Sequence, residues 1–472
     1  MIHQIVYKEV LENVLSLRFC LFLLLAILLF AASGFVFLGR YRTQSQNYWK
    51  KTNENLLALQ KESDQLYKLA FYQQKILRKP KPLTLCAEGF EKSLPNNFKF
   101  NIFSIHLPEI EGRSNFMLPH FSDIDWVFIV SLILSFVALV FTYDSICGER
   151  ERGTLRLMLS NAIPRYTVLL GKYLAAMLTL VIPLLIGLIV SLIIVVSSKD
   201  VAIDGAAWLK ILTIILLSLL YLSVFVLLGV FFSSRLAHSA NCMVILLLMW
   251  VGLVILVPSL GRIISDMSSQ SPTQIELQRK LAEVAAQIWD NADKFGKNAS
   301  NMGTKPNSPG NNPPARARLK TALTNARNQV IEDHHGKMLA QVFTGRNFTC
   351  LSPVVIYQRA SEAMAGTGIN RCVNLYQQIQ QHQADLKQYI RGEDAEDPDS
   401  LHLIFDEEQC AYWWKAISHK SVDFDTVPKF QERDRALGQS LKLAIWDIGL
   451  LALLNLGLFA ASFLSFLRYD VR

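Results

Sequence analysis

The fold of this chain is decided by residues 126–196, which read WVFIVSLILSFVALVFTYDSICGERERGTLRLMLSNAIPRYTVLLGKYLAAMLTLVIPLLIGLIVSLIIVV. Two long apolar runs flank a short segment that is rich in arginine and glutamate. A helix of roughly 20 residues crosses a hydrocarbon core of about 30 Å. Because every backbone N–H and C=O inside lipid needs a partner within its own segment, both runs are expected to be α-helices.

The same kind of run recurs along the 472-residue chain, at 19–39, 126–145, 174–196, 211–232, 241–258 and 443–467. These runs hold only two charged side chains, Asp144 and Asp447, in a chain that is 51% hydrophobic and 18% charged. The remaining residues have the charge density of an ordinary soluble protein. This composition excludes a soluble enzyme, a fibrous protein and a largely disordered chain. It predicts an all-α membrane protein with six transmembrane helices.

The distribution of arginine and lysine predicts which segments lie on each side of the membrane. Short positive loops stay in the cytoplasm, whereas long domains cross largely regardless of charge. The rule places residues 1–18, 146–173, 233–240 and the tail 468–472 in the cytoplasm, so both termini are cytoplasmic. It places a short loop, 197–210, and two long insertions, 40–125 and 259–442, outside. Trp126, Trp208 and Trp446 then open the inward-running spans, at the interface that indole rings prefer.

Residues 1–18 are expected to form an amphipathic helix at the membrane surface, because apolar side chains recur at helical spacing from Ile2 to Val14. The following run is expected to stay as an uncleaved anchor. Acidic residues accompany the basic ones ahead of it, and the run continues to Gly39. A cleaved leader is the alternative.

The two insertions are expected to form a large, mainly helical extracytoplasmic domain. A long helix is predicted at roughly 43–78, and Pro80 ends it. The second insertion has matched helical patterns at 277–288 and 319–330, which a polar loop separates, and a third helix is expected near 372–391. These apolar stripes are expected to form the core of the domain. Coiled-coil pairing with another subunit is the alternative.

Four cysteines lie in the two insertions, namely Cys86, Cys350, Cys372 and Cys410. An even number on the oxidising side of a membrane predicts up to two disulfides, with four unpaired thiols as the alternative. No metal site is expected. His334, His335 and Met338 could hold soft copper, but such a cluster on a polar helix is more often a solvated surface.

The segment between spans two and three is the most informative part of the chain. Asp144 ends a span, glutamate and arginine alternate after it, and a short amphipathic helix is predicted from Leu155 to Leu159. Such a helix, held between two spans, can seat in a groove of a cytoplasmic partner and pass a push to the spans. The alternative is a solvated loop whose charges only enforce topology.

This segment closely resembles the signature of ABC-type-2 transporter permeases, the membrane subunits of certain ATP-driven transporters. In that family an aspartate ends the span and G-E-R/K-E, G-T-L, a serine, P-x-R and G-K follow. The matching residues are Asp144, Gly148, Glu149, Arg150, Glu151, Gly153, Thr154, Leu155, Ser160, Pro164, Arg165, Gly171 and Lys172.

The resemblance implies a coupling helix near 149–160, including Arg152, that contacts a nucleotide-binding subunit. Glu149 and Glu151 are expected to meet basic groups or backbone N–H groups there. Leu155, Met158 and Leu159 are expected to fill an apolar groove of the same partner.

A narrower resemblance covers KPLTLCAEGFEKSLP at 81–95, LSPVVIYQRASEAMAGTGI at 351–369 and the closing YDVR at 469–472. These segments are similar to a bacterial subfamily with large extracytoplasmic insertions, related to permeases of nitrous-oxide-reductase maturation and of gliding motility. The resemblance implies a multi-pass protein of the bacterial cytoplasmic (inner) membrane.

The sequence contains no G-x-x-x-x-G-K-S/T phosphate loop. ATP and Mg²⁺ are therefore expected on a separate ATPase subunit, present in two copies, and this chain is expected to be neither an enzyme nor to hold a cofactor. Its other expected partners are membrane lipid, a second permease copy, most plausibly identical, and a periplasmic or lipoprotein partner, but no nucleic acid. The expected function is to export a substrate or to transmit force across the membrane. The alternative is a membrane-anchored scaffold or sensor whose ectodomain binds a periplasmic partner without translocation.

Asp144 is expected to organise the junction with the ATPase. Asp447, near the opposite end of a span, is either functional or reaches water at the interface.

Overall fold

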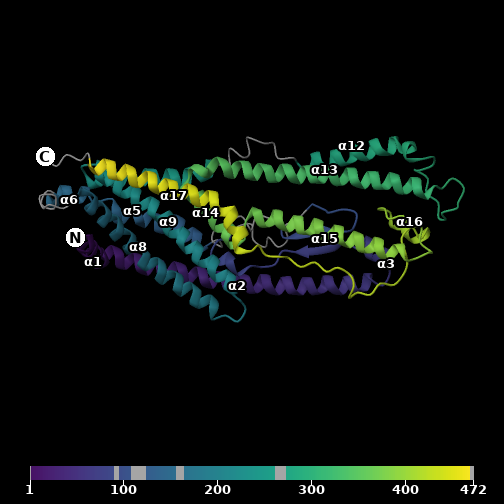
Figure 1. Ribbon diagram of the computed structural model, residues 1–472, viewed down its shortest axis with the longest axis horizontal. Coiled ribbons are helices and arrows are strands. Elements are labelled where there is room, and N and C mark those ends of the chain that lie inside the picture. The colour runs from purple at the N-terminus through teal and green to yellow at the C-terminus, as the bar shows by residue number, and fades with distance from the viewer. Residues whose placement is uncertain (1, 90–94, 108–123, 156–163, 261–272, 468–472) are drawn as a thin grey trace.

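The computed structural model describes residues 2–89, 95–107, 124–155, 164–260 and 273–467. The molecule is elongated, with both termini at one end (Figure 1). Six helices long and apolar enough to cross a membrane gather at that end, and we call them the bundle. Residues 63–89, 95–107 and 273–436 form the distal domain, most of which extends away from the bundle, while residues 353–365 pack against the spans. The chain is thus an all-α membrane protein with six candidate spans, as the composition predicts.

Each of the six predicted runs falls inside one of these helices. They are α2 (Leu17–Glu62), a composite helix of α4 (Trp126–Phe128), the π-helical segment Ile129–Leu134 and α5 (Ser135–Thr142), then α8 (Arg165–Val196), α9 (Gly205–Arg235), α10 (Ser239–Trp250) with the π-helical segment Val251–Leu256, and α17 (Leu437–Leu467). α9 is the most buried span and α10 the least. α10 and α17 therefore offer the largest apolar faces to lipid or to another chain.

Close approach and a few polar contacts hold the spans together. Gly187 of α8 lies against the ring of Phe30 in α2, where a Cβ atom would stand only 2.3 Å from the ring. The Trp126 indole donates to Ser191 Oγ at 3.0 Å, and Trp126 is only 1% exposed. The indole of Trp126 thus packs within the protein, and its expected position at the outer interface stays a prediction. Trp208 and Trp446 are exposed, as anchors should be.

Helix α2 continues beyond the span into the distal domain. Its 46 residues correspond to a rod of about 69 Å at 1.5 Å per residue. The expected separate helix at 43–78 is wrong in its end: α2 stops at Glu62, and the short helix α3 (Leu66–Phe71) and strand β1 (Gln74–Leu77) follow. β1 pairs antiparallel with β2 (Asn97–Phe100), and Ile76 faces Phe98. The long helix therefore ends well before Pro80. Residues 74–77 alternate between buried and exposed positions, as a strand does.

The distal domain is built by both insertions. Helices α12 (Gln274–Asp290) and α13 (Pro313–Phe348) lie side by side along one edge, and α15 (Ile369–Ala395) runs beside α3 and the two strands (Figure 1). The segment between α13 and α15 forms α14 (Pro353–Ala365), and α16 (Glu408–Trp413) lies at the far end. One apolar core joins Leu66 and Phe98 of the first insertion to Leu375 and Ile379 of the second. The two insertions therefore fold together.

The four cysteines of the insertions form no disulfide within the described residues, which include every cysteine of the chain. Cys86, Cys372 and Cys410 belong to three different apolar clusters, and Cys350 Sγ accepts a hydrogen bond from Arg359. The expectation of disulfides is therefore not met, because the fold separates residues that share a segment of sequence. Of the residues weighed as copper ligands, His335 packs its ring against Tyr376, with 4.4 Å between ring centroids.

Candidate functional site

The signature segment lies at the end of the bundle that carries the termini (Figure 1). The helix α1 (Ile2–Val14) runs along α8 there, and the short helix α6 (Cys147–Glu151) sits beside the start of α10. Of the signature residues, Met158, Leu159 and Ser160 lie outside the described residues.

Lys172 joins three helices at this end. Its ammonium Nζ lies 2.8 Å from Glu149 Oε1 in α6 and 2.9 Å from Glu9 Oε1 in α1, and its side chain is 1% exposed. Two carboxylates around one buried ammonium replace the water that the charge loses. Glu149 thus meets a basic group of its own chain, and its expected contact with basic or backbone N–H groups of a partner subunit stays a prediction.

Gly171 allows α1 to approach. A Cβ atom at this position would lie 2.9 Å from the side chain of Ile5, so a larger residue would push α1 off α8. Asn13 also donates to Thr179 Oγ1 at 3.4 Å. The G-K pair therefore docks the N-terminal helix: glycine provides the space and lysine the charge.

Glu151 connects α6 to the start of α10. Its carboxylate accepts hydrogen bonds from the Ser239 N–H at 2.9 Å and the Ser239 hydroxyl at 2.8 Å. A carboxylate at a helix N-terminus satisfies an orphan N–H group and favours the helix dipole. The Glu151 carboxylate therefore caps the start of α10.

The residues that follow α6, which form the tip of the signature segment, have roles in the local structure. Gly153 has a φ of +76°, a left-handed conformation that ends α6 and that glycine adopts without strain. The Thr154 hydroxyl donates to the Glu149 carbonyl oxygen at 3.2 Å. Leu155 is 1% exposed and packs with Ile146 and Val168, so its expected insertion into a partner's groove is wrong. Among the described residues of this tip, the exposed ones are Arg150, Glu151, Arg152, Gly153 and Thr154.

Two further signature residues pin the segment to neighbouring spans. Asp144 Oδ2 lies 3.7 Å from Arg18 Nη1, at the start of α2. Arg165 follows Pro164, which caps α8, and it donates to the Leu467 carbonyl oxygen at the end of α17 at 2.7 Å. Gly148 lies so close to Asp144 that a Cβ atom would be 3.2 Å from the aspartate Cβ. Side chains of the signature therefore bind this one segment to α1, α2, α10 and α17.

A second polar site lies where the distal domain enters the bundle. Helix α14 packs against α9 and α17, level with the spans: Ser352 Oγ donates to the Leu253 carbonyl oxygen at 2.6 Å, and the Tyr357 hydroxyl is 2.6 Å from Ser218 Oγ. Arg359 Nε lies 3.4 Å from Asp447 Oδ1. Asp447 is only 3% exposed and therefore does not reach water in this structure. Its charge is balanced by Arg359 instead.

The two insertion segments that resemble the narrower subfamily meet at the same place. Thr367 Oγ1 donates to the Ala87 carbonyl oxygen at 2.8 Å, and Lys81 Nζ donates to Gly366 at 3.1 Å. Glu362 lies against Gly89 and Gly368, where a Cβ atom would stand 2.2 Å and 2.5 Å from its carboxylate oxygens. Both glycines also have a positive φ, +55° and +73°, which other residues rarely adopt. The glycines in both segments indicate in the sequence that the backbone is closely approached there. Only the fold shows that the two segments contact each other.

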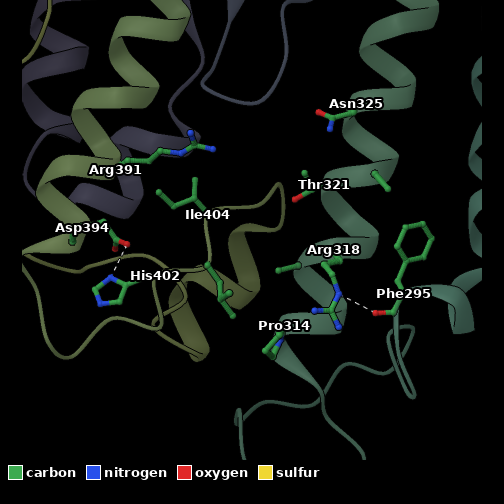
Figure 2. A pocket seen from close by; sticks show the side chains of 13 residues that line it. Phe295, Pro314, Arg318, Thr321, Asn325, Arg391, Asp394, His402 and Ile404 are labelled. Atoms are coloured by element: carbon green, nitrogen blue, oxygen red, sulfur yellow. Dashed lines mark hydrogen bonds and ion pairs between the residues drawn. The ribbon is translucent and has the colours of Figure 1, made fainter.

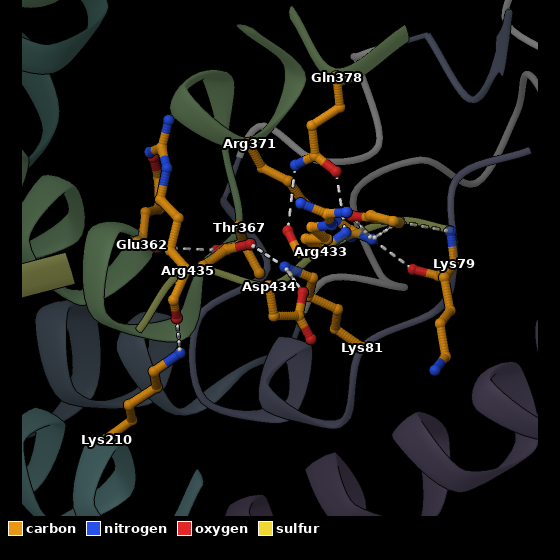
Figure 3. Close-up of polar contacts among 12 residues, drawn as sticks. Lys79, Lys81, Lys210, Glu362, Thr367, Arg371, Gln378, Arg433, Asp434 and Arg435 are labelled. Carbon is orange, nitrogen blue, oxygen red and sulfur yellow. Dashed lines mark hydrogen bonds and ion pairs between the residues drawn. The ribbon is translucent and has the colours of Figure 1, made fainter. Parts of the chain in front are cut away.

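Further ion pairs tie these segments to the chain that leads into α17. Lys81 Nζ lies 2.7 Å from Asp434 Oδ1, and Arg371 binds Glu432 with both Nε and Nη2, at 2.9 Å and 3.1 Å. Lys210 of α9 donates to the Arg435 carbonyl oxygen at 3.0 Å. Figure 3 shows that these contacts lie together between the spans and the distal domain. The distal domain is therefore attached to the bundle by the buried Arg371–Glu432 pair and by further polar contacts, as well as by helix α2.

A bundle of six spans with a clamped charged segment at one end is the architecture of a transporter membrane subunit. Comparison with protein families agrees: the chain belongs to the ABC-2 family of transporter proteins, whose family model matches residues 3–471. A stretch of 59 residues is 41% identical to the probable ABC transporter permease protein NosY of Pseudomonas aeruginosa. The corresponding protein of Stutzerimonas stutzeri is 39% identical over 59 residues. These matches cover 12% of this chain and 22% and 21% of the two relatives, about a fifth of each.

Proposed function

We propose that this chain is the permease subunit of an ATP-driven ABC transporter and that it transmits movement from a separate ATPase to its distal domain. Two ATPase copies would hold ATP and Mg²⁺, and two permease copies would form a homodimer. The distribution of arginine and lysine supports a bacterial inner-membrane protein with both termini in the cytoplasm.

The observation that carries this proposal is the contact of Lys172 with both Glu9 and Glu149. Through it, displacement of α6 reaches α1 as well as α8. Helix α2 follows α1 after Ser16, whose hydroxyl caps it, and α2 is continuous into the distal domain. A rigid helix transfers axial and tilting motion over its whole length, so a push at the signature segment is felt at Glu62.

The contact surface for the ATPase differs from the one expected from sequence. Glu149 and Leu155 are held within the chain, whereas Glu151, Arg152 and Thr154 are exposed at the tip. We place the ATPase against this exposed face, where an acidic or carbonyl-rich groove would receive Arg152.

Force transmission is favoured over export by the position of α14. This helix fills the space between α9 and α17 at the mouth of the bundle, and its Tyr357 is fully buried there. A substrate that left the bundle by this route would have to displace α14 and the Arg359–Asp447 pair.

The test uses the permease with its ATPase in lipid nanodiscs and a spin label at Gln60, an exposed position near the end of α2. We expect the distance between the two labels of a dimer to change when ATP is added. Lys172→Met should abolish this change, whereas Lys199→Met, an exposed lysine at the other end of the α8–α9 hairpin, should preserve it. An unchanged label distance in the wild-type complex during ATP hydrolysis would refute force transmission.

A further inference from the structure

Two cysteines at the signature end of the bundle take no part in the contacts described so far. Cys147 lies in α6 and Cys242 lies in the first turns of α10, and both are free thiols in this structure. The distal domain also has a cavity of about 750 Å³ between α13 and the end of α15 (Figure 2), but its carboxylate, Asp394, is bound within the wall to His402 at 3.1 Å. The cysteines, in contrast, join two helices of the candidate site.

The two thiols contact each other. The side chains of Cys147 and Cys242 are hydrogen-bonded to one another. The Cys147 thiol donates to the Tyr143 carbonyl oxygen at 2.9 Å, which leaves its sulfur as the acceptor for Cys242. The Ser233 hydroxyl of α9 also donates to this sulfur, at 3.4 Å. Both cysteines are 0% exposed and belong to one apolar cluster. The two sulfurs are therefore held together in a closed site.

Two thiols in contact can be joined by a two-electron oxidation, and a hydroperoxide is a sufficient oxidant. One sulfur attacks a peroxide oxygen, the O–O bond breaks, and the leaving oxygen takes the thiol proton to become an alcohol, or water from hydrogen peroxide. The second sulfur then attacks the resulting sulfenic acid, the S–OH bond breaks, and water leaves with the second thiol proton. The two sulfurs lose two electrons, and the hydroperoxide gains them.

A bond between these sulfurs would fix the position of α6. An S–S bond is about 2.0 Å long, which is shorter than a hydrogen-bond contact between two sulfurs, so α6 and α10 must draw together when it forms. Glu151 already binds the start of α10 through Ser239, so the bond would be a second attachment between the same two helices. It would also hold Glu149 of α6, together with the Lys172 that Glu149 binds.

We propose that Cys147 and Cys242 form a reversible disulfide when the protein meets a hydroperoxide, and that this bond fixes α6 to α10. Disulfides on the cytoplasmic side of a membrane, where this end of the bundle is expected to lie, are usually transient and redox-sensing. The effect on movement rests on the proposed function. Formation of the bond requires no ATPase, so the two proposals can fail separately.

The first test treats the full-length permease in nanodiscs, without ATPase, with hydrogen peroxide or cumene hydroperoxide. The protein is then denatured, free thiols are blocked with iodoacetamide, and unreduced peptides are analysed by mass spectrometry. We expect a peptide pair linked through Cys147 and Cys242, and its loss in Cys242→Ala. The matched control is present in the same sample: Cys372 and Cys410 are also buried but lie in separate cores, and both should stay as thiols.

Two results would overturn the disulfide. Cys147 and Cys242 could both remain thiols under conditions that fully oxidise the exposed Cys20, or each could be converted separately to a sulfinic acid. Both results are read from the wild-type chain and do not depend on how a variant folds.

The second test adds the ATPase and follows the label at Gln60. The ATP-dependent change in label distance should be lost after treatment with hydroperoxide and should return after reduction of the disulfide. Cys242→Ala should keep the change under the same treatment. A change that persists in the linked protein would overturn the fixation of α6. A lack of change in the untreated wild-type complex would refute force transmission, whereas the disulfide is decided by the mass spectrum alone.

Discussion

The ammonium of Lys172 lies 2.8 Å from the carboxylate of Glu149, which places the two most charged parts of the signature against each other in the interior of one chain. The G-E-R-E part of the pattern and its G-K part are therefore complementary halves of a single contact. The same lysine also binds Glu9, so α1 belongs to the site although the signature does not include it.

Replacement of Lys172 by methionine should destabilise the end of the bundle. It leaves two carboxylates close together and largely buried, and removal of one partner of a buried ion pair costs about 3 to 5 kcal/mol. We expect a lower thermal unfolding temperature in detergent and faster proteolysis of α1. Lys172→Met combined with Glu9→Gln and Glu149→Gln should recover much of the loss. An equal effect of the single and triple variants would contradict the ion-pair account.

Replacement of Glu151 by alanine should loosen the start of α10. The loss of a capping carboxylate costs typically about 1 kcal/mol. Hydrogen exchange at Ser239 should therefore increase, while exchange in the centre of α9 stays unchanged. Glu12→Ala is a suitable control, because its exposed contact with Lys8 contributes little to stability.

Replacement of Arg359 by leucine should release α14 from α17. The variant leaves Asp447 buried without its cation, so we expect a lower unfolding temperature and greater accessibility of α14 to modification. Asp447→Asn in the same chain removes the unpaired charge and should restore part of the stability. If Asp447→Asn in the Arg359→Leu background gives no recovery, the pair is not what holds α14.

The tip of the distal domain should lose stability in acid. Burial raises the pKa of Glu407, but hydrogen bonds from Arg316 and Lys320 outweigh burial and hold the pKa below its usual 4.5. Because the folded pKa is depressed, the stabilisation is present above the unfolded value and is lost as the pH falls through the folded value. Fluorescence of Trp414, which is buried beside Phe405, should report this transition. Glu407→Gln should lower the stability at neutral pH and flatten its dependence on pH between about 2 and 5.

The number and positions of the spans could be predicted because lipid imposes a condition on every residue of a span. Twenty consecutive apolar residues have few alternatives to a transmembrane helix. The signature was also recognisable, since its residues lie within one short segment. The contact partners of those residues could not be predicted, because Lys172, Ser239 and Leu467 approach the segment from other helices.

The errors have one physical origin. Glu149, Glu151 and Leu155 look available to a partner when only the sequence is considered, but all three have contacts within this chain. Disulfides are expected among four cysteines of the insertions, yet Cys372 and Cys410 lie in different cores and Cys350 contacts Arg359. Trp126 fits an interface position by sequence, but α8 brings Ser191 to its indole and buries it.

By itself, the sequence determined that this is a six-span, all-α membrane protein of the ABC-2 permease type, because hydrophobic length and a local motif are properties of consecutive residues. Only the tertiary structure decided that α2 is one rod from the bundle to the distal domain, that α14 enters the mouth of the bundle, and that Lys172 unites α1, α6 and α8. Those features depend on which distant side chains come together in a buried site. A buried charge is costly unless an opposite charge lies beside it, and that partner can come from any part of the chain.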